Sequence, residues 1–76
     1  MRMFMIDAYG GAAGTDGGIH HFGVQAETAE EARELVRSSA TGERFTRFDV
    51  VEIGDEFEGD EAEIVAEAEG PYGKPA

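Results

Sequence analysis

Residues 1–9 read MRMFMIDAY. Apolar side chains occupy both parities of this run, with Phe4 and Ile6 alternating against Met3 and Met5. Successive side chains of a β-strand point to opposite faces of its sheet. The run therefore predicts a central strand that is covered on both sides.

A second strand is predicted a short distance along the chain. Residues 10–18 (GGAAGTDGG) are glycine-rich, which is typical of a long hairpin connection. No Gly-Lys-Ser/Thr sequence ends this segment and no helix start follows it, so a phosphate-binding loop is not supported. Residues 19–26 (IHHFGVQA) alternate again, with Phe22 and Val24 on one face. We expect this strand to run antiparallel to the first.

A helix is predicted next. Residues 28–31 read TAEE, a capping box in which the threonine hydroxyl accepts from a backbone N–H three residues on and the glutamate reaches back to the helix start. Ala32, Leu35 and Val36 follow at helical spacing and form one narrow apolar stripe. Acids come early and arginines late in this segment, which complements the helix dipole.

The carboxyl-terminal third begins with a third predicted strand. Residues 45–53 (FTRFDVVEI) are rich in β-branched and aromatic side chains, and their apolar parity changes between Val50 and Val51. That change indicates a β-bulge or burial on both faces. Residues 54–60 (GDEFEGD) are predicted to form an acidic turn.

Residues 62–68 (AEIVAEA) support two interpretations. As a strand, Ile64 and the alanines would face inward and the glutamates outward, whereas as a helix the segment would gain an Asp60 cap and good intrinsic propensity. We favour the strand, paired as a hairpin with residues 45–53. The predicted fold is α+β: a small antiparallel β-β-α-β-β sheet with one helix packed on one face, in a single domain of residues 1–70. A flexible tail, residues 71–76, follows, and the second sheet face is expected to be polar or joined to another copy.

Composition restricts the classes of function. The chain has 76 residues, no cysteine and a formal net charge of −11. This charge disfavours direct binding to nucleic acid or anionic lipid and favours a cationic partner. Residues 50–76 hold nine acids against Lys74 alone, so the acidity is concentrated in one third of the chain. Without a membrane-spanning run or a signal peptide, a cytoplasmic location is expected.

The sequence does not support a catalytic or a metal-binding site. His20 and His21 are adjacent in a predicted strand and would point to opposite faces, so they could not share one metal ion. We expect one of them to be half-buried and the other to face solvent. The segment DEFEGDEAE, residues 55–63, departs from a calcium-loop pattern at Phe57 and Gly59. We therefore expect no enzyme activity, no cofactor and no metal.

The remaining candidate site is the acidic segment itself. In a strand, Glu67 and Glu69 would form a short row about 6.7 Å apart, continued across the predicted hairpin by Glu52 or Asp49. Phe57 and Tyr72 would supply apolar anchors within the charge. The predicted partner-binding residues are Asp49, Glu52, Asp55, Glu56, Phe57, Glu58, Asp60, Glu61, Glu63, Glu67 and Glu69.

The chain resembles a known group of inhibitors. Residues 3–11 (MFMIDAYGG), a polar loop, a second strand and the helix of residues 28–38 (TAEEARELVRS), in a small acidic chain without catalytic residues, are similar to phage-encoded anti-CRISPR proteins that mimic nucleic acid. The resemblance implies a viral inhibitor in the host cytoplasm. It would bind a basic nucleic-acid-binding protein, such as a subunit of the Cascade complex, and block its DNA-binding surface.

Two alternatives stay open at the level of sequence. The first is a small structural or interaction module, with a homodimer as one option, from a salt-adapted or high-GC organism. The acidic composition, rich in alanine and with arginine in place of most lysine, fits this alternative. The other is a calcium-binding module, which the broken loop pattern makes the weaker of the two.

Overall fold

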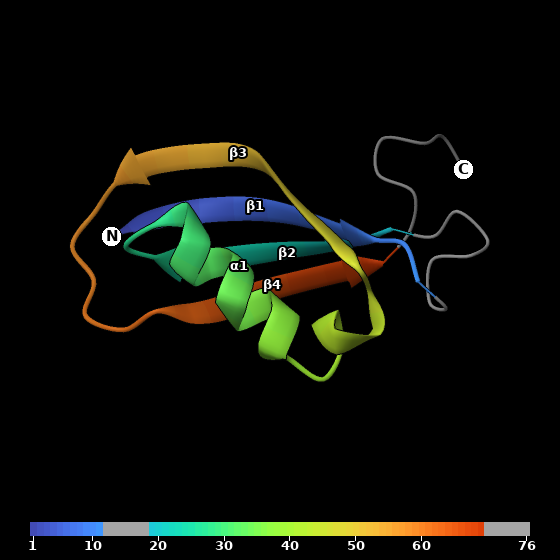
Figure 1. The fold of residues 1–76 in the computed structure, drawn as a ribbon. Coiled ribbons are helices and arrows are strands. Elements are labelled where there is room, and N and C mark those ends of the chain that lie inside the picture. The colour runs from blue at the N-terminus through green and yellow to red at the C-terminus, as the bar shows by residue number, and fades with distance from the viewer. Residues whose placement is uncertain (12–18, 70–76) are drawn as a thin grey trace.

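The computed structural model describes residues 1–11 and 19–69. Their elements in chain order are β1 (Arg2–Tyr9), β2 (His20–Ala26), α1 (Ala29–Ser38), the short 3-10 helix η2 (Gly42–Arg44), β3 (Arg47–Glu56) and β4 (Glu63–Glu69). The strands form a four-stranded antiparallel sheet and α1 lies across one face of it (Figure 1). The predicted α+β fold is confirmed, as is the strand interpretation of residues 62–68. The predicted tail and most of the predicted hairpin loop, residues 12–18, lie outside the described residues.

The order of strands in the sheet is β3-β1-β2-β4. The predicted hairpin between the third and fourth strands is therefore wrong, because β3 pairs with β1 and β4 pairs with β2. The β1–β2 hairpin carries the most apolar surface and occupies the centre, where the largest share of each strand is buried. The acidic strands β3 and β4 lie at the two edges, where charged side chains remain solvated and hinder edge-to-edge pairing. Residues 57–62 cross the end of the sheet from one edge to the other (Figure 1).

The core lies between α1 and the central hairpin. Phe22, Ile6, Val24 and Val36 are the largest fully buried side chains of the described residues. Ala32 of the helix is also fully buried, so the predicted apolar stripe is the surface that packs on the sheet. Burial of such side chains contributes about 1.5–3 kcal/mol each, which makes this layer the main source of stability.

The start of α1 has the predicted cap with one difference. The Glu31 backbone N–H donates to the Thr28 hydroxyl at 3.1 Å. The Glu31 carboxylate accepts from the backbone N–H of Glu27 at 2.8 Å, one residue earlier than the capping box predicts. Glu30 pairs with Arg33 at 2.9 Å on the exposed side of the helix, and Glu34 pairs with Arg37.

Register shifts interrupt both edge strands, at two places in β3 and at one place in β4. In β3 the pairing shifts between Met5 and Ile6, which leaves Val51 as the extra residue at the predicted position. In β4 the shift leaves Val65 as the extra residue. Both valines are exposed, at 54% and 45%. A bulge changes which side chains face the core.

The bulge in β4 corrects the predicted orientation of this strand. Ile64 pairs with Val24 on the helix side, as expected, but Ala66 pairs with Gly23 and therefore faces the other side. The prediction that the alanines face inward and Glu67 outward is wrong beyond Val65. Glu67 lies opposite Phe22, on the same side of the sheet as α1.

The face of the sheet away from α1 has no cover from the described residues, so within these residues β1 is covered on the helix side only. We call the face away from α1 the open face. Cross-strand pairing places the following residues on it: Met3, Met5, Asp7, Tyr9, His21, Gly23, Gln25, Arg47, Asp49, Glu52, Glu63, Ala66 and Ala68.

The helix α1 is too short and too polar to cross a membrane, and the same holds for any other helix in the described ranges.

Gly42 should be sensitive to substitution because the chain turns tightly against the end of α1 there. A Cβ atom at this position would lie 1.7 Å from the Val36 carbonyl oxygen, which is backbone and cannot rotate away. We expect Gly42→Ala to lower the free energy of unfolding by about 1–3 kcal/mol. Urea denaturation measures this, and Ser38→Ala on the exposed helix end should stay within about 0.5 kcal/mol of the parent. Equal stability of both variants would contradict the packing of this turn.

Candidate functional site

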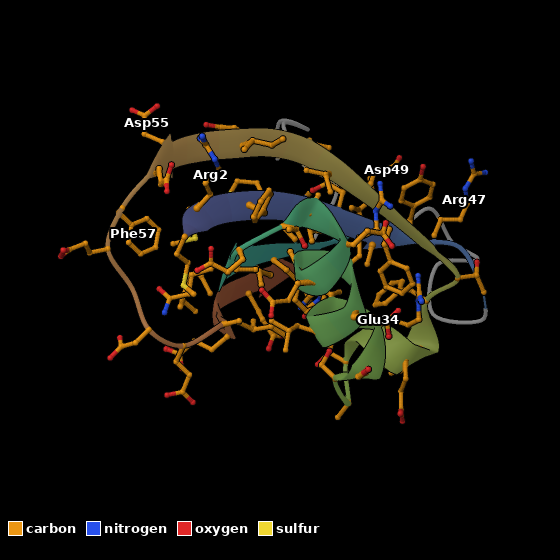
Figure 2. All side chains as sticks on the ribbon, turned by 60° about the vertical axis from the view of Figure 1, so that its left-hand side comes forward. Arg2, Glu34, Arg47, Asp49, Asp55 and Phe57 are labelled. Carbon is orange, nitrogen blue, oxygen red and sulfur yellow. The ribbon has the colours of Figure 1, made fainter. Side chains whose placement is uncertain are left out.

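The predicted acidic residues border the sheet instead of forming one flat surface. We call this border the acidic rim, and its members are Asp49, Glu52, Asp55, Glu56, Glu58, Asp60, Glu61, Glu63, Glu67 and Glu69. It follows the β3 edge, continues through the end loop, which we define as residues 57–62, and returns along β4. In Figure 2, Asp55 and Phe57 both lie at the end of the sheet where the end loop crosses, while Asp49 lies far along β3.

The expected row of carboxylates across β3 and β4 is not formed. These strands are separated by β1 and β2, a distance of about 14 Å at ordinary strand spacing. The carboxylates of the expected row also lie on different sides of the sheet. Asp49 and Glu52 lie opposite Asp7 and Met5 on the open face, whereas Glu67 lies on the helix side. Within the described residues, the acidic rim continues from β3 to β4 only through the end loop.

The end loop brings together three carboxylates that have no ion pair within the described residues. Glu58, Asp60 and Glu61 are exposed, and no basic side chain of residues 1–11 or 19–69 forms an ion pair with them. The Glu61 carbonyl accepts from the Gln25 side chain at 2.9 Å, which fixes the loop to β2. A fixed loop presents its charges at lower entropic cost than a mobile one.

Arg2 partly neutralises one end of the rim. Its guanidinium donates to the Gly54 carbonyl at 3.0 Å and lies 3.9 Å from the Glu56 carboxylate. Figure 2 shows Arg2 between Asp55 and the body of the sheet. Both partners of the ion pair are well exposed, so it contributes little to stability.

Phe57 provides an apolar surface within this charge. Its backbone N–H donates to the Met1 carbonyl at 2.8 Å, and its carbonyl accepts from the Met1 amino group at 3.1 Å. The residue is 37% exposed. A shallow depression of about 570 Å³ lies beside it and is lined by Met1, Glu27, Glu56, Phe57, Glu58, Gly59 and Asp60. The other expected anchor, Tyr72, lies outside the described residues.

Besides Glu56, two more members of the acidic rim have partners within the chain. The Glu67 carboxylate lies 3.1 Å from His20 Nε2, and the His20 ring packs 4.8 Å from the Phe22 ring. Asp49 accepts a short hydrogen bond from the Tyr9 hydroxyl. These two carboxylates are less available to a partner than those of the end loop.

The two histidines lie on opposite faces, as predicted, but neither of them faces solvent freely. The side chains of His20 and His21 are only 12% and 11% exposed. His21 Nδ1 lies 2.7 Å from Asp7 on the open face. The expectation of one solvent-facing histidine is wrong, because each ring has a carboxylate and a neighbouring strand beside it. Across the described ranges, no three His, Asp or Glu side chains are arranged to hold a metal ion.

The open face carries a cluster of polar side chains that the sequence did not predict. Asp7 lies between Asp49 of β3 and His21 of β2, and Tyr9 bonds Asp49 while its ring lies 5.3 Å from the Arg47 guanidinium. The Asp7 carboxylate contacts the His21 imidazole on the neighbouring strand. The Tyr9 hydroxyl donates a hydrogen bond to the Asp49 carboxylate. These contacts reduce the repulsion between two directly opposed aspartates.

Comparison with known protein families, with curated proteins and with solved structures finds no match for this chain.

The hydrogen bond to Asp49, with smaller effects of partial burial and nearby carboxylates, raises the pKa of Tyr9 above its ordinary value. A raised phenol pKa means that the folded state favours the neutral form. The contact is thus stabilising below the ordinary phenol pKa, and this stability is lost as the pH rises through the raised value.

The Tyr9 contact is testable by ultraviolet titration, because the chain has two tyrosines and no tryptophan. In a Tyr72→Phe background only Tyr9 titrates, and we expect a pKa above that of a free phenol. Asp49→Ala should lower this pKa, whereas Glu52→Ala, on the same strand, should not remove the shift. An unchanged titration after Asp49→Ala would contradict the contact.

Proposed function

We propose that this protein is a non-enzymatic inhibitor that presents its carboxylates to the basic groove of a nucleic-acid-binding protein, with a Cascade-type CRISPR complex as the proposed target. The observation that carries the proposal is the end loop. It holds three exposed carboxylates without a basic partner in the described residues, next to the half-exposed ring of Phe57. An apolar anchor surrounded by charge is a common arrangement in protein interfaces.

The mechanism would be competition for cationic side chains. Arginines and lysines that normally hold phosphates would pair with the carboxylates of the end loop instead. The net charge of −11 would speed the encounter by long-range attraction, and the effect would weaken as salt screens it. The anchoring of the loop to Met1 and Gln25 supports the proposal, since a preorganised surface loses less entropy on binding.

The depression beside Phe57 would receive one cationic side chain of the target. Its lining includes Phe57, the acidic residues Glu27, Glu56, Glu58 and Asp60, and Met1, whose amino group lies 3.8 Å from the Glu27 carboxylate. A guanidinium group can lie over an aromatic ring while it pairs with a neighbouring carboxylate. In this proposal the end loop replaces the predicted row across two strands as the centre of the binding surface.

Charge reversal should locate the binding surface. We expect Glu58→Lys, Asp60→Lys and Glu61→Lys together to weaken binding to the purified complex by on the order of tenfold to a hundredfold, because attractive rim contacts become repulsive. The matched control reverses Glu30, Glu34 and Glu43, which changes the net charge equally but lies away from the end loop. Competition against labelled target DNA at low salt measures both.

The control decides the interpretation of that experiment. Both triple variants should keep the circular dichroism spectrum of the parent protein, since all six side chains are exposed. If the helix-side variant loses as much affinity as the end-loop variant, only net charge matters and the proposed binding surface is wrong. If neither variant loses affinity, charge mimicry is excluded.

A second candidate function is favoured by the acids outside the rim. Glu30, Glu31, Glu34 and Glu43 are exposed on and beside α1, so acidity also covers the side opposite the open face. This distribution fits a small interaction module adapted to high salt. Such a protein needs salt to offset the repulsion among its own charges.

Thermal unfolding at low and high salt separates the two candidates. For an inhibitor we expect a cooperative transition at low salt and only a small rise of the midpoint when salt is added. A salt-adapted module should be unfolded or barely stable at low salt and gain a large increase in the midpoint. The second result would contradict the mimicry proposal.

A further inference from the structure

The ring of Phe57 is both held in place and accessible. A Cβ atom placed on Gly59 would lie 3.1 Å from ring atom Cε2 and 3.1 Å from the Met1 sulfur, so the end loop packs closely against this edge of the ring. The backbone of the residue is bonded to Met1 in both directions. Phe57 is nevertheless the only exposed aromatic residue in the ranges 1–11 and 19–69. A fixed, exposed ring is a platform on which a cation can lie.

Unpaired carboxylates adjoin this ring in the depression described above. Its acidic lining residues are Glu27, Glu56, Glu58 and Asp60. Glu56 lies 3.9 Å from Arg2, and Glu27 lies 3.8 Å from the Met1 amino group. Glu58 and Asp60 have no ion pair with the described residues. An incoming cation would therefore meet one aromatic ring and two carboxylates that are free of ion pairs within these ranges.

The chain itself shows which cation packs in such surroundings. The Arg37 guanidinium lies 5.9 Å from the centre of the Phe48 ring, and the same side chain is paired with the carboxylate of Glu34. The Arg47 guanidinium lies 5.3 Å from the centre of the Tyr9 ring. An arginine over an aromatic ring is thus an arrangement that this fold already contains twice.

An arginine over Phe57 would have to come from another molecule. All five arginines of the chain lie in the described residues, and none of them has its guanidinium over this ring. Arg2 donates to the Gly54 carbonyl instead, and Arg47 lies at the far end of the sheet from Phe57 (Figure 2). The ring and its carboxylates match the arrangement at Phe48 in every part except the cation.

A guanidinium group fits this site better than an ammonium group. It is planar and carries five N–H donors in a fixed geometry, so its face can lie on a ring while its edges bond two carboxylates. It is also more weakly hydrated. The ammonium group of lysine is compact and strongly hydrated, so it loses more hydration when it leaves water for a ring surface. The depression therefore favours arginine over lysine.

We infer that the depression beside Phe57 binds the guanidinium group of an arginine side chain of the partner and discriminates against lysine. This inference rests on the proposed function, because it names the group that the end loop receives. Phe57 is then the residue that determines specificity, and Glu58 and Asp60 bond the edges of the guanidinium. The partner is accordingly a protein whose groove presents an exposed arginine.

Nuclear magnetic resonance titration with two short peptides tests the inference. Each is a blocked pentapeptide of glycine with a single central arginine or lysine, so the two carry the same charge. At low salt we expect the arginine peptide to shift the amide signals of residues 57–60 and the ring signals of Phe57. It should bind about threefold to tenfold more tightly than the lysine peptide. Equal binding of both peptides, or no shift with either, would overturn the inference.

Three variants of the chain identify the groups responsible. Phe57→Leu keeps every charge and should reduce the affinity for the arginine peptide to that for the lysine peptide. Glu58→Gln should weaken binding of the arginine peptide by about twofold to fivefold. Glu43→Gln removes the same charge on η2, away from the end loop, and should bind like the parent. A Phe57→Leu variant that still prefers arginine would contradict the assigned role of the ring.

This inference and the proposed function can fail separately. The peptides test the depression without the Cascade-type complex, whereas the end-loop charge reversal tests binding to that complex. Equal peptide affinities, together with a loss of affinity in the charge-reversal variant, would overturn the arginine preference alone. A clear preference for the arginine peptide, together with unchanged binding of that variant to the complex, would support the inference about the depression and contradict the proposed target.

Discussion

The packing of α1 on the β1–β2 hairpin is the interaction on which the rest of this structure depends. Ile6, Phe22, Val24 and Val36 are fully buried within that layer, and the described residues have no comparable cluster elsewhere. One ten-residue helix can cover only the middle of a four-stranded sheet. The central positions therefore go to the two strands with the most apolar surface, and the acidic strands are left at the edges.

This constraint also determines where the charge is presented. Since β3 and β4 occupy opposite edges, the chain between them has to cross the end of the sheet, and residues 57–62 do so (Figure 1). Three carboxylates and Phe57 are thereby brought together in a loop fixed to Met1 and Gln25. The same constraint leaves the second face of the sheet without cover from the described residues.

Local features of the fold could be predicted from the sequence, whereas the arrangement of strands could not. The TAEE cap and the stripe through Val36 indicated α1, and the parity change at Val51 indicated a bulge, because these signals depend on neighbouring residues alone. Sheet order depends on which edge a strand joins, and either edge satisfies the same alternation. A hairpin between the last two strands was the simpler expectation. The bulge at Val65 then reversed the predicted face of Glu67, since one inserted residue changes every side chain beyond it.

The central functional claim is that the end loop, rather than the edges of the sheet, contacts a cationic partner. Hydrogen–deuterium exchange of the free protein and of its mixture with a purified Cascade-type complex tests this most directly, because it maps the contact without any substitution. The account predicts protection concentrated in residues 55–62 and little change in α1. Protection confined to α1 or to residues 63–69, or no protection at all, would contradict it.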